Sequence, residues 1–531
     1  ESHGTASLWL RPLDQATAHQ LYGTEGAVLP FWSPDSQSIG IFAGGSLKRV
    51  DISGGTPRTL ANAAPGFGGA WSADGVILFA STGTTSLLRV PADGEGEAVA
   101  QTTLDRPRHV SHSFPLFLPG GRDFIFFARG TSEGQGIHLG SLDAPGITRL
   151  TAADGPPFAL VTRQAPEAHW LLYVRQGRLM AQRWDAARRM LSGEAVSIVD
   201  SVATAAPSVY SINFGAFGAF SASRSGLIAY RTGANVPTQL TWFDRSGRPD
   251  GTFDAPDELL QHPELSRDGR QVAVSRTVEG NTDAYLIDGA RRTRRTFDAA
   301  IERYPLWSPD GNWLAFASER KGVADLYRKR VSGGGGDELL KESPNNKNVD
   351  DWSPNGQFLL YNEEDPVTLR DLWVLPLDGD RKPFVFLKTN SQEHRGQFSP
   401  DGRFIAYVSN EPGSHEIFVR PFPPSNDDNQ WQISSGGGIQ PRWSHDGREI
   451  YYIAPDGKLM ATPLVAKGGA IEQGRPKQLF QTRIPGGGLQ AYQRPQYDVS
   501  SDGRFLVNTI VEGTATSSIT RDNRAMPFSS D

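Results

Sequence analysis

The sequence predicts an all-β chain of two tandem β-propellers, with about eleven four-stranded antiparallel blades. An aromatic or aliphatic residue followed by Ser-Pro-Asp-Gly, or a near copy, recurs about ten times. In the second half, the Asp or Asn of this phrase stands at positions 268, 310, 355, 401 and 446, so the steps are 42, 45, 46 and 45 residues. This period is typical of a four-stranded blade. The 58 Gly and 37 Pro are spread through all 531 residues, which suits a turn-rich β protein.

The repeated phrase predicts a hairpin turn. Proline presets φ for the first turn position, and an Asp such as Asp310 or Asp401 can accept a hydrogen bond from the backbone two residues on. Gly311 and Gly402 can take the positive φ that closes the hairpin. The cleanest copies begin at Trp307, Trp352 and Phe398, and looser ones begin at Trp32, Trp71, Phe117, Leu265, Trp443 and Val499.

One blade can be followed from Tyr304 to Leu340. Apolar and aromatic runs alternate there with a Pro-Asp-Gly turn, a polar loop and a Gly-rich turn. They predict four antiparallel strands, over residues 305–308, 313–318, 325–331 and 338–340.

The large residue at the head of each phrase is expected to pack between neighbouring blades, because sheets that stack face to face need a bulky apolar side chain there. A tryptophan at such a spacing could instead stack on a sugar ring. The positions assigned this structural role are Trp32, Trp71, Trp307, Trp352, Phe398 and Trp443.

The repeat is faintest between Pro156 and Ser225, which predicts an N-terminal propeller over 1–213, a second over 214–512 and a polar tail over 513–531. Leu8–Leu21 resembles the outer strands of a blade, whereas Tyr497–Thr509 resembles an inner hairpin. We therefore expect the two ends of the chain to complete one blade together, which removes a free sheet edge. The alternative is that the first blade's inner strands lay upstream in a longer parent chain.

The phrase Trp307–Gly311, with the strands Leu314–Ser318 and Asp325–Tyr327 after it, resembles the TolB-type, WD40-like propeller repeat. Gln239–Gly247 and Ala454–Ala461 are similar to the extracytoplasmic region that follows the kinase domain in many bacterial serine/threonine kinases. The kinase motifs themselves are absent from the sequence. The resemblance covers nearly the whole chain. It implies a propeller outside the cytoplasm, either as the sensor of a receptor kinase or as a subunit docked on a membrane-associated complex, as TolB docks on its envelope partners.

Composition excludes several classes of protein. The net charge of −6 argues against a nucleic-acid binder, and the one basic cluster, Arg291–Arg295, is expected on a solvated edge strand. The absence of cysteine excludes disulfides and thiolate metal sites, and it is compatible with a periplasmic or extracellular location. No apolar run is long enough to cross a bilayer. The chain starts at Glu1 without a methionine, so any leader or anchor would have preceded it.

The motifs that could carry chemistry each have a structural interpretation. Gly130–Gly134 matches Gly-x-Ser-x-Gly, but it lies between two predicted strands and lacks the helix that a nucleophile elbow needs. His109 and His112 are weak candidates for metal ligands, and convergence with other histidines at a propeller rim would favour them. Asn426–Asn429 and Glu363–Asp365 are acidic loops that are interpreted as solvated turns.

The sequence therefore favours a non-catalytic, extracytoplasmic propeller that binds a protein or another ligand as a scaffold or sensor, with no cofactor. Rigid stacked blades present their loops on two flat faces, which suits protein docking. The alternative is a carbohydrate-active enzyme, a metal-assisted lyase or hydrolase with its site in a propeller channel. No assignment of a catalytic residue is made.

Overall fold

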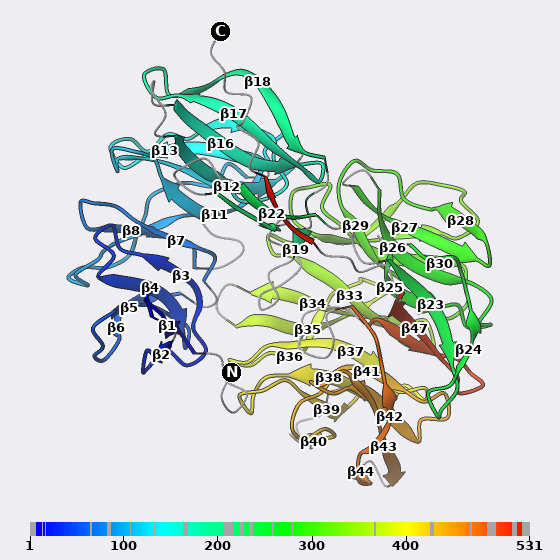
Figure 1. Ribbon diagram of the computed structural model, residues 1–531. Coiled ribbons are helices and arrows are strands. Elements are labelled where there is room, and N and C mark those ends of the chain that lie inside the picture. The colour runs from blue at the N-terminus through cyan, green and yellow to red at the C-terminus, as the bar shows by residue number, and fades with distance from the viewer. Residues whose placement is uncertain are drawn as a thin grey trace. The chain divides into compact units, whose positions relative to one another are not determined.

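The computed structural model describes the chain apart from residues 1–6, 13, 16, 64–65, 82–85, 107, 132, 163–167, 201, 203, 206–216, 223–227, 233–236, 258–259, 279–280, 366–367, 425–428, 468–469, 486–494, 512–517 and 523–531. All regular secondary structure in the described part is β (Figure 1). It includes eleven antiparallel sheets of three or more strands. The predicted fold class is thereby confirmed. The described part holds no helix that could span a membrane.

The chain divides into two compact units. Unit 1 comprises Glu1–Gly233 with Ser517–Asp531, and unit 2 comprises Ala234–Thr516. The predicted boundaries, at residues 213 and 512, differ from these by 20 and 4 residues respectively. The first difference arises because β21 (Phe220–Ala222) and β22 (Ile228–Thr232) pair with each other and belong to unit 1.

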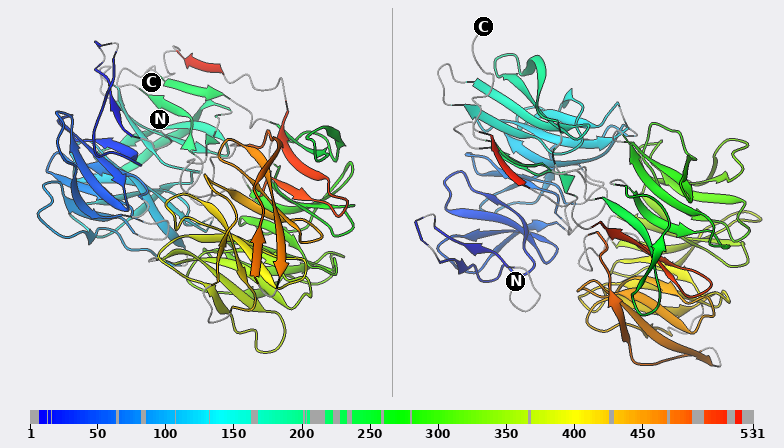
Figure 2. Two further views of the ribbon diagram at one scale, coloured as in Figure 1. Left: turned by 90° about the horizontal axis from the view of Figure 1, so that it is seen from below. Right: turned by 45° about the vertical axis from the view of Figure 1, so that its right-hand side comes forward.

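Unit 2 is built from six sheets (Figure 2). Four of them take four consecutive strands each, a fifth runs from β41 to β45, and the sixth has the order β24-β23-β47-β46. The strands are β23 (Thr238–Phe243), β24 (Pro249–Thr252), β25 (Leu260–Leu265), β26 (Val272–Val278), β27 (Asn281–Asp288), β28 (Arg291–Arg294), β29 (Glu302–Trp307), β30 (Trp313–Ser318), β31 (Asp325–Arg330), β32 (Glu338–Lys341), β33 (Lys347–Trp352), β34 (Phe358–Asp365), β35 (Leu369–Pro376), β36 (Phe384–Leu387), β37 (Glu393–Phe398), β38 (Phe404–Ser409), β39 (Glu416–Pro421), β40 (Trp431–Gln432), β41 (Ile439–Trp443), β42 (Glu449–Ile453), β43 (Lys458–Lys467), β44 (Ala470–Gln473), β45 (Lys477–Gln481), β46 (Tyr497–Val499) and β47 (Phe505–Ile510).

Unit 1 has four four-stranded sheets, a three-stranded sheet of order β21-β22-β48, and two two-stranded ribbons, β1–β2 and β19–β20. Its other strands are β1 (Trp9–Leu10), β2 (His19–Gln20), β3 (Val28–Trp32), β4 (Ser38–Ala43), β5 (Ser46–Asp51), β6 (Arg58–Asn62), β7 (Gly69–Trp71), β8 (Val76–Phe79), β9 (Leu88–Pro91), β10 (Val99–Ala100), β11 (His109–Phe117), β12 (Asp123–Gly130), β13 (Gly136–Ser141), β14 (Thr148–Thr151), β15 (Phe158–Thr162), β16 (Ala168–Arg175), β17 (Arg178–Asp185), β18 (Met190–Val199), β19 (Thr204–Ala205), β20 (Phe217–Gly218) and β48 (Ser518–Asp522).

The pairing of the chain ends differs from our expectation. The hairpin β46–β47 pairs with β23, in a register from Thr238↔Ile510 to Phe243↔Phe505, instead of with the strands of Leu8–Leu21. The hydroxyl groups of Thr241 and Thr509 lie 2.9 Å apart and join the two strands further. Unit 2 therefore closes on outer strands that stand at its own beginning. The N-terminal strands β1 and β2 pair with each other.

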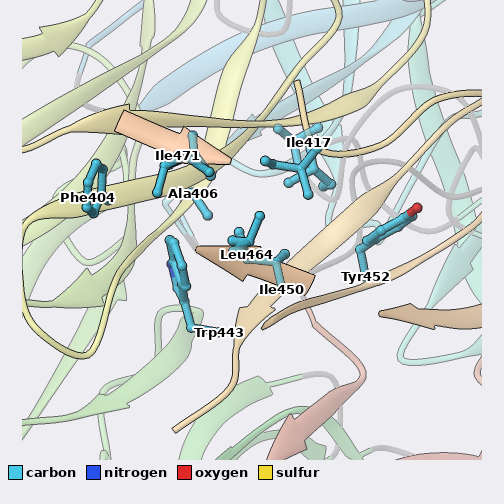
Figure 3. Packing of buried hydrophobic residues seen from close by; sticks show 11 residues of the cluster. Phe404, Ala406, Ile417, Trp443, Ile450, Tyr452, Leu464 and Ile471 are labelled. Atoms are coloured by element: carbon cyan, nitrogen blue, oxygen red, sulfur yellow. The ribbon is translucent and has the colours of Figure 1, made fainter. Parts of the chain in front are cut away.

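The core consists of layers between successive sheets (Figure 3). In one layer, Phe404 and Ala406 from β38 pack against Trp443 of β41 and Ile450 of β42. Burying a large apolar side chain such as that of Phe404 or Ile450 contributes about 1.5–3 kcal/mol to the free energy of folding. Alternate residues of each strand face the two neighbouring sheets, which explains why most central strands are buried throughout.

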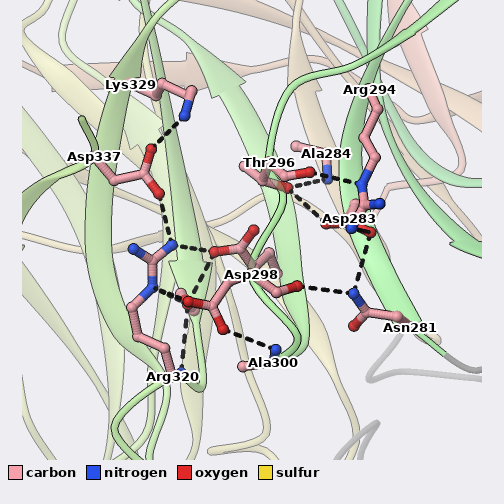
Figure 4. A network of polar contacts seen from close by, with 12 residues as sticks. Asn281, Asp283, Ala284, Arg294, Thr296, Asp298, Ala300, Arg320, Lys329 and Asp337 are labelled. Atoms are coloured by element: carbon pink, nitrogen blue, oxygen red, sulfur yellow. Dashed lines mark hydrogen bonds and ion pairs between the residues drawn. The ribbon is translucent and has the colours of Figure 1, made fainter. Parts of the chain in front are cut away.

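A polar network joins two neighbouring sheets of unit 2 where their loops meet (Figure 4). Arg294 of the edge strand β28 pairs with the buried carboxylate of Asp283 at 2.7 Å. Arg320 contacts Asp337 at 2.7 Å and Asp298 at 3.8 Å, and Asn281 donates to the carbonyl of Asp298 at 2.9 Å. The Arg291–Arg295 cluster thus includes the edge strand β28, and two of its arginines are matched by acidic side chains, since Arg292 pairs with Asp254 and Asp257.

Candidate functional site

The Ser-Pro-Asp-Gly phrase forms a closed hydrogen-bonded turn. In the copy between β37 and β38, the hydroxyl of Ser399 donates to Asp401 Oδ1 at 2.6 Å and accepts from the backbone N–H of Phe404 at 3.0 Å. Gly402 has φ 71° and donates its N–H to the carbonyl of Ser399. In the copy at Asp310 and Gly311, the hydrogen bond from the Ser308 hydroxyl lowers the pKa of the Asp310 carboxyl. Asp310, Gly311, Asp401 and Gly402 therefore build the hairpins.

The large residues at the head of the phrase lie between sheets in unit 2. Trp307, Trp352, Phe398 and Trp443 are 4–8% exposed and pack against side chains of the preceding sheet. The indole N–H of Trp443 also donates to the carbonyl of Gln397, one sheet back, at 3.2 Å.

In unit 1 the same position is less buried. Trp71 is partly buried, with the guanidinium of Arg49 5.4 Å from its ring. Trp32 is 51% exposed. The head residues of the two units are therefore not equally enclosed.

A hollow lies where the innermost strands of unit 2 meet. It is lined by side chains from β25, β29, β33, β37 and β41, and by Pro495 just before β46, so all six sheets contribute to it. Its walls combine apolar, aromatic and charged groups, including His262, Glu264, Tyr304, Arg395, Gln397 and Arg442. It is the central channel of this propeller.

A repeated irregularity shapes the wall of the channel. His262, Tyr304 and Gln440 have φ of 57–62°, and each is followed by a proline. The strand register shifts at each of these points, as in a β-bulge. Leu29 and Phe114 in unit 1 have the same conformation before a proline. Because both units share this positive φ before a proline, we attribute the backbone strain to the fold itself and not to a site in unit 2.

Beside the channel, one arginine is surrounded by carboxylates. Arg442 pairs with Glu264 at 2.5 Å and with Asp498 at 3.4 Å. Burial raises the pKa of Glu264 to about 8, against the opposing charge of Arg442. Burial also raises the pKa of Asp351 to about 7. The cluster therefore takes up or releases protons close to neutral pH.

These carboxylates also link neighbouring sheets. Asp351 Oδ2 accepts the backbone N–H of Phe398 at 2.7 Å, and Asp498 Oδ2 accepts that of Leu265 at 2.8 Å. None of Glu264, Asp351, Arg442 and Asp498 was predicted from the sequence as a site residue, yet the sequence contains a signal for them. Each of them stands immediately before the head residue of its repeat.

His109 and His112 lie in a buried stack of rings in unit 1. His112 Nε2 is 3.2 Å from His109 Nδ1, and His112 Nδ1 is 2.8 Å from the hydroxyl of Thr102. The ring of His138, which the sequence did not single out, lies edge-on to His109 at 4.8 Å between centroids, and Phe126 contacts His112 and His138. Across the part of the chain that the structure describes, no group of three or more His, Asp or Glu side chains has the arrangement of a metal site.

The histidines of this stack are held in the neutral form. Burial lowers the pKa of His112 to about 2 and that of His138 to about 4, and it also lowers the pKa of His109. Neutral imidazoles that stack edge to face behave as aromatic core residues. The convergence of histidines that the sequence left open is therefore a buried packing arrangement, at the ends of β11 and β12.

The remaining sequence candidates have local structural roles. Gly130 ends β12, and a Cβ on it would lie 1.6 Å from the carbonyl oxygen of Arg108, so glycine is required there by the close approach of backbone. Ser132 lies outside the described residues, as do Asn426, Asp427 and Asp428. At the end of β34, Glu364 pairs with Arg370 at 2.9 Å and Asp365 with Lys388 at 2.6 Å.

Comparison with known proteins finds a family match for part of the chain. Residues 257–370 match the PD40 family, described as the TolB beta propeller domain. The Tol-Pal system protein TolB of Helicobacter pylori is 27% identical over 162 residues, which are 29% of this chain and 37% of that protein. TolB of Desulfosudis oleivorans is 37% identical over 92 residues, or 17% of this chain and 20% of that protein. The chain thus spans 20–37% of the length of these curated relatives.

Other matches cover different shares of the chain. Tricorn protease homolog 1 of Streptomyces coelicolor is 31% identical over 108 residues, which are 20% of this chain and 10% of that protein. Among solved structures, a putative TolB from Agrobacterium tumefaciens aligns with a TM-score of 0.42 at 19% identity and covers 52% of this chain and 98% of that one. The predicted TolB-type repeat is confirmed. The similarity to kinase-associated regions stays a prediction.

Proposed function

Since the chain carries a TolB-type β-propeller domain, we propose that it is a non-catalytic binding scaffold whose unit 2 docks an extended segment of a partner protein at the mouth of its central channel. The observation that carries this proposal is the composition of the channel wall. Six sheets bring charged, aromatic and proline side chains together around one hollow.

The wall is suited to a polypeptide with both apolar and charged side chains. Tyr304 and the prolines give the hollow an apolar lining, while Arg395 and the Arg442–Glu264 pair give it charge, although Tyr304, Arg395 and Arg442 are only 3–6% exposed. The bulges that carry these residues lie in the innermost strand of each sheet, and this strand is paired along its other edge with the second strand. The channel wall is therefore held in place before a partner binds. Binding to a preformed surface avoids part of the entropic cost of ordering it.

The location that fits this proposal is periplasmic or extracellular. Two relatives are named as Tol-Pal system proteins, and the absence of cysteine from 531 residues suits an oxidising compartment. The partner is a protein of a membrane-associated complex, and nucleic acid is not a ligand at a net charge of −6.

The test is site-specific photo-crosslinking in the source organism. A benzoylphenylalanine replaces Pro495, a half-buried residue of the channel lining, or, as the control, Phe297, which is 67% exposed on the same unit. We expect a discrete cross-linked species at position 495 that is absent at position 297. Equal labelling at both positions, or none at position 495, would overturn the channel as the docking site. Turnover of a polysaccharide by the purified chain would instead establish the enzyme class.

A further inference from the structure

The closing sheets of the two units differ in how they are assembled. In unit 2, the inner strands β46 and β47 are followed outward by β23 and β24, which come from the beginning of that unit. In unit 1, the inner strands β21 and β22 are followed by β48, which comes from residues 518–522 after unit 2. A strand from the beginning of unit 1 does not occupy this place.

The ribbon β1–β2 has the sequence of the outer strands that are missing. Leu8-Trp9-Leu10-Arg11-Pro12 matches Leu372-Trp373-Val374-Leu375-Pro376 of β35, which is the third strand of its sheet. In the described residues, β1 pairs with β2 alone. A two-stranded ribbon is marginally stable by itself, and a third-strand sequence is suited to pairing with a second strand.

The hairpin β21–β22 and the ribbon β1–β2 pack on the two sheets that flank the closing blade of unit 1. Phe220, Ile228 and Tyr230 of β21–β22 pack against the sheet β15–β18. Leu8, Leu10 and Leu21 of the ribbon pack against Ile39 and Ile41 of β4, in the first complete sheet. The four four-stranded sheets of unit 1 follow one another in the chain, from β3–β6 to β15–β18. In a closed ring, the closing blade therefore lies between the last of these sheets and the first.

The exposure of Trp32 is a separate indication that the closing blade of unit 1 is incomplete. In unit 2, the four aromatic residues at the equivalent position are covered by the preceding sheet and are 4–8% exposed, whereas Trp32 is 51% exposed. The sheet that would precede β3–β6 in a closed ring is the closing blade. Trp9 of the ribbon is also exposed, at 52%.

We propose that the outer edge of β22 is a strand-acceptor surface whose second partner is β1, so that β1–β2 and β48 compete for it. With β1 on this edge, β21-β22-β1-β2 is a complete four-stranded blade that covers Trp32. With β48 there, as in this structure, unit 1 is bound to the segment that follows unit 2, and the ribbon remains outside the sheet. The two states exchange one set of strand hydrogen bonds for another.

The expected register follows from the repeat. Tyr361↔Trp373 in β34–β35 and Phe316↔Tyr327 in β30–β31 pair aromatic residues at one level. Tyr230 is the corresponding residue of β22 and Trp9 that of β1, so Ala229 is expected opposite Leu10. In the state seen here, Ala229 pairs with Arg521.

The test uses disulfide trapping, for which a chain without cysteine is well suited. Ala229→Cys is combined with Leu10→Cys to trap β1, or with Arg521→Cys to trap β48, because paired strand positions lie within disulfide reach. Ala229→Cys with Arg11→Cys, one residue out of register, is the matched control, since its side chain points to the other face.

We expect both in-register pairs to form a disulfide under mild oxidation, and the control pair to form little. Locking residues 10 and 229 should lower hydroxyl-radical oxidation of Trp32 several-fold and should open residues 518–522 to protease. In a second measurement, Thr520→Pro weakens β48 and should raise the yield of the 10–229 disulfide. If only one of the two in-register pairs ever forms, whichever it is, there is no exchange and the proposal is wrong.

Discussion

Units 1 and 2 are built from the same repeat, yet one position of this repeat has different chemistry in the two units. The residue just before the head position is Glu264, Asp351, Gln397, Arg442 or Asp498 in five repeats of unit 2. In unit 1 the corresponding residues are Phe31, Ala70 and Leu116. The repeat can thus keep its turns while this one position carries either a polar or an apolar side chain.

The units also differ in the titratable groups they bury. Unit 1 holds the neutral histidine stack, whose pKa values are lowered by burial. Unit 2 holds Glu264 and Asp351, whose pKa values are raised by burial. Stability that depends on a buried neutral base is lost in acid, and stability that depends on a buried neutral acid is lost in alkali, so the two units are expected to respond to pH in opposite directions. The buried His415 of unit 2, whose pKa is lowered to about 4, reduces this contrast.

The largest difference is expected at the head residue of the repeat. Trp352→Ala should lower the free energy of unfolding of unit 2 by up to about 5 kcal/mol, because a buried tryptophan leaves a cavity. Trp32→Ala, at the same place in a repeat of unit 1, should cost less than about 1 kcal/mol because its ring is half exposed. Denaturant unfolding followed for each unit by hydrogen exchange measures both. Equal costs would mean that Trp32 is covered in solution.

The next effect is the acid response of unit 1. His112 and His138 have folded pKa values of about 2 and 4, and in the unfolded chain they titrate near their ordinary value. Between pH 8, above the unfolded pKa of about 6.5, and pH 5, the two groups together should remove about 4 kcal/mol of stability from unit 1. The measurement is the unfolding free energy of unit 1 across this range.

The matched variants for the acid response are His138→Gln, which should flatten it, and His445→Gln at an exposed histidine, which should leave it unchanged. Over the same range unit 2 should gain stability as the pH falls, because Glu264 and Asp351 retain protons that their unfolded forms release. Parallel loss in both units would contradict the assignment of neutral histidines to unit 1.

A smaller effect is expected at the charge cluster of unit 2. Arg442→Met should destabilise this unit by about 3 kcal/mol, at the lower end of the range for a broken buried ion pair, because Glu264, with its pKa raised to about 8, carries little charge at neutral pH to be left unpaired. Arg448→Ala, at an exposed arginine beside strand β42, should change stability by less than about 0.5 kcal/mol. Thermal unfolding measures both, and a stabilising Arg442→Met would show that the cluster is retained for binding alone.

The smallest effect should be the same in both units. Ser399→Ala and Ser33→Ala each remove the hydroxyl that joins the turn Asp to the next strand, where Ser33 Oγ donates to Asp35 at 2.6 Å and accepts from Ser38 N–H at 2.9 Å. Each should cost about 1–2 kcal/mol, since a buried N–H loses its acceptor. A large difference between the two variants would show that the turn has a different role in each unit.

The sequence was sufficient to predict the turns and the stacked sheets, because these depend on residues close together in the chain and on their spacing. Asp310-Gly311 requires a turn, and the spacing of Trp307, Trp352 and Phe398 requires stacked sheets, so the blades could be placed without a structure. The strand that pairs with the inner hairpin of each closing sheet could not be predicted in this way. The candidates β23, β1 and β48 are all short strands, and only the packing of whole sheets selects among them. The channel cluster was missed because Glu264 and Arg442 are 178 residues apart and meet only when the ring closes.

The measurement that tests this account most directly is hydrogen exchange of the intact chain at pH 7, comparing the closing sheets of the two units. The account predicts that amides of β23 and β47 exchange as slowly as those of the central strand β34, because unit 2 closes on its own strands. It predicts that amides of β22 exchange orders of magnitude faster, because this edge is briefly unpaired each time β48 leaves and β1 takes its place. Equal protection of β22 and β47 would contradict the difference between the two propellers.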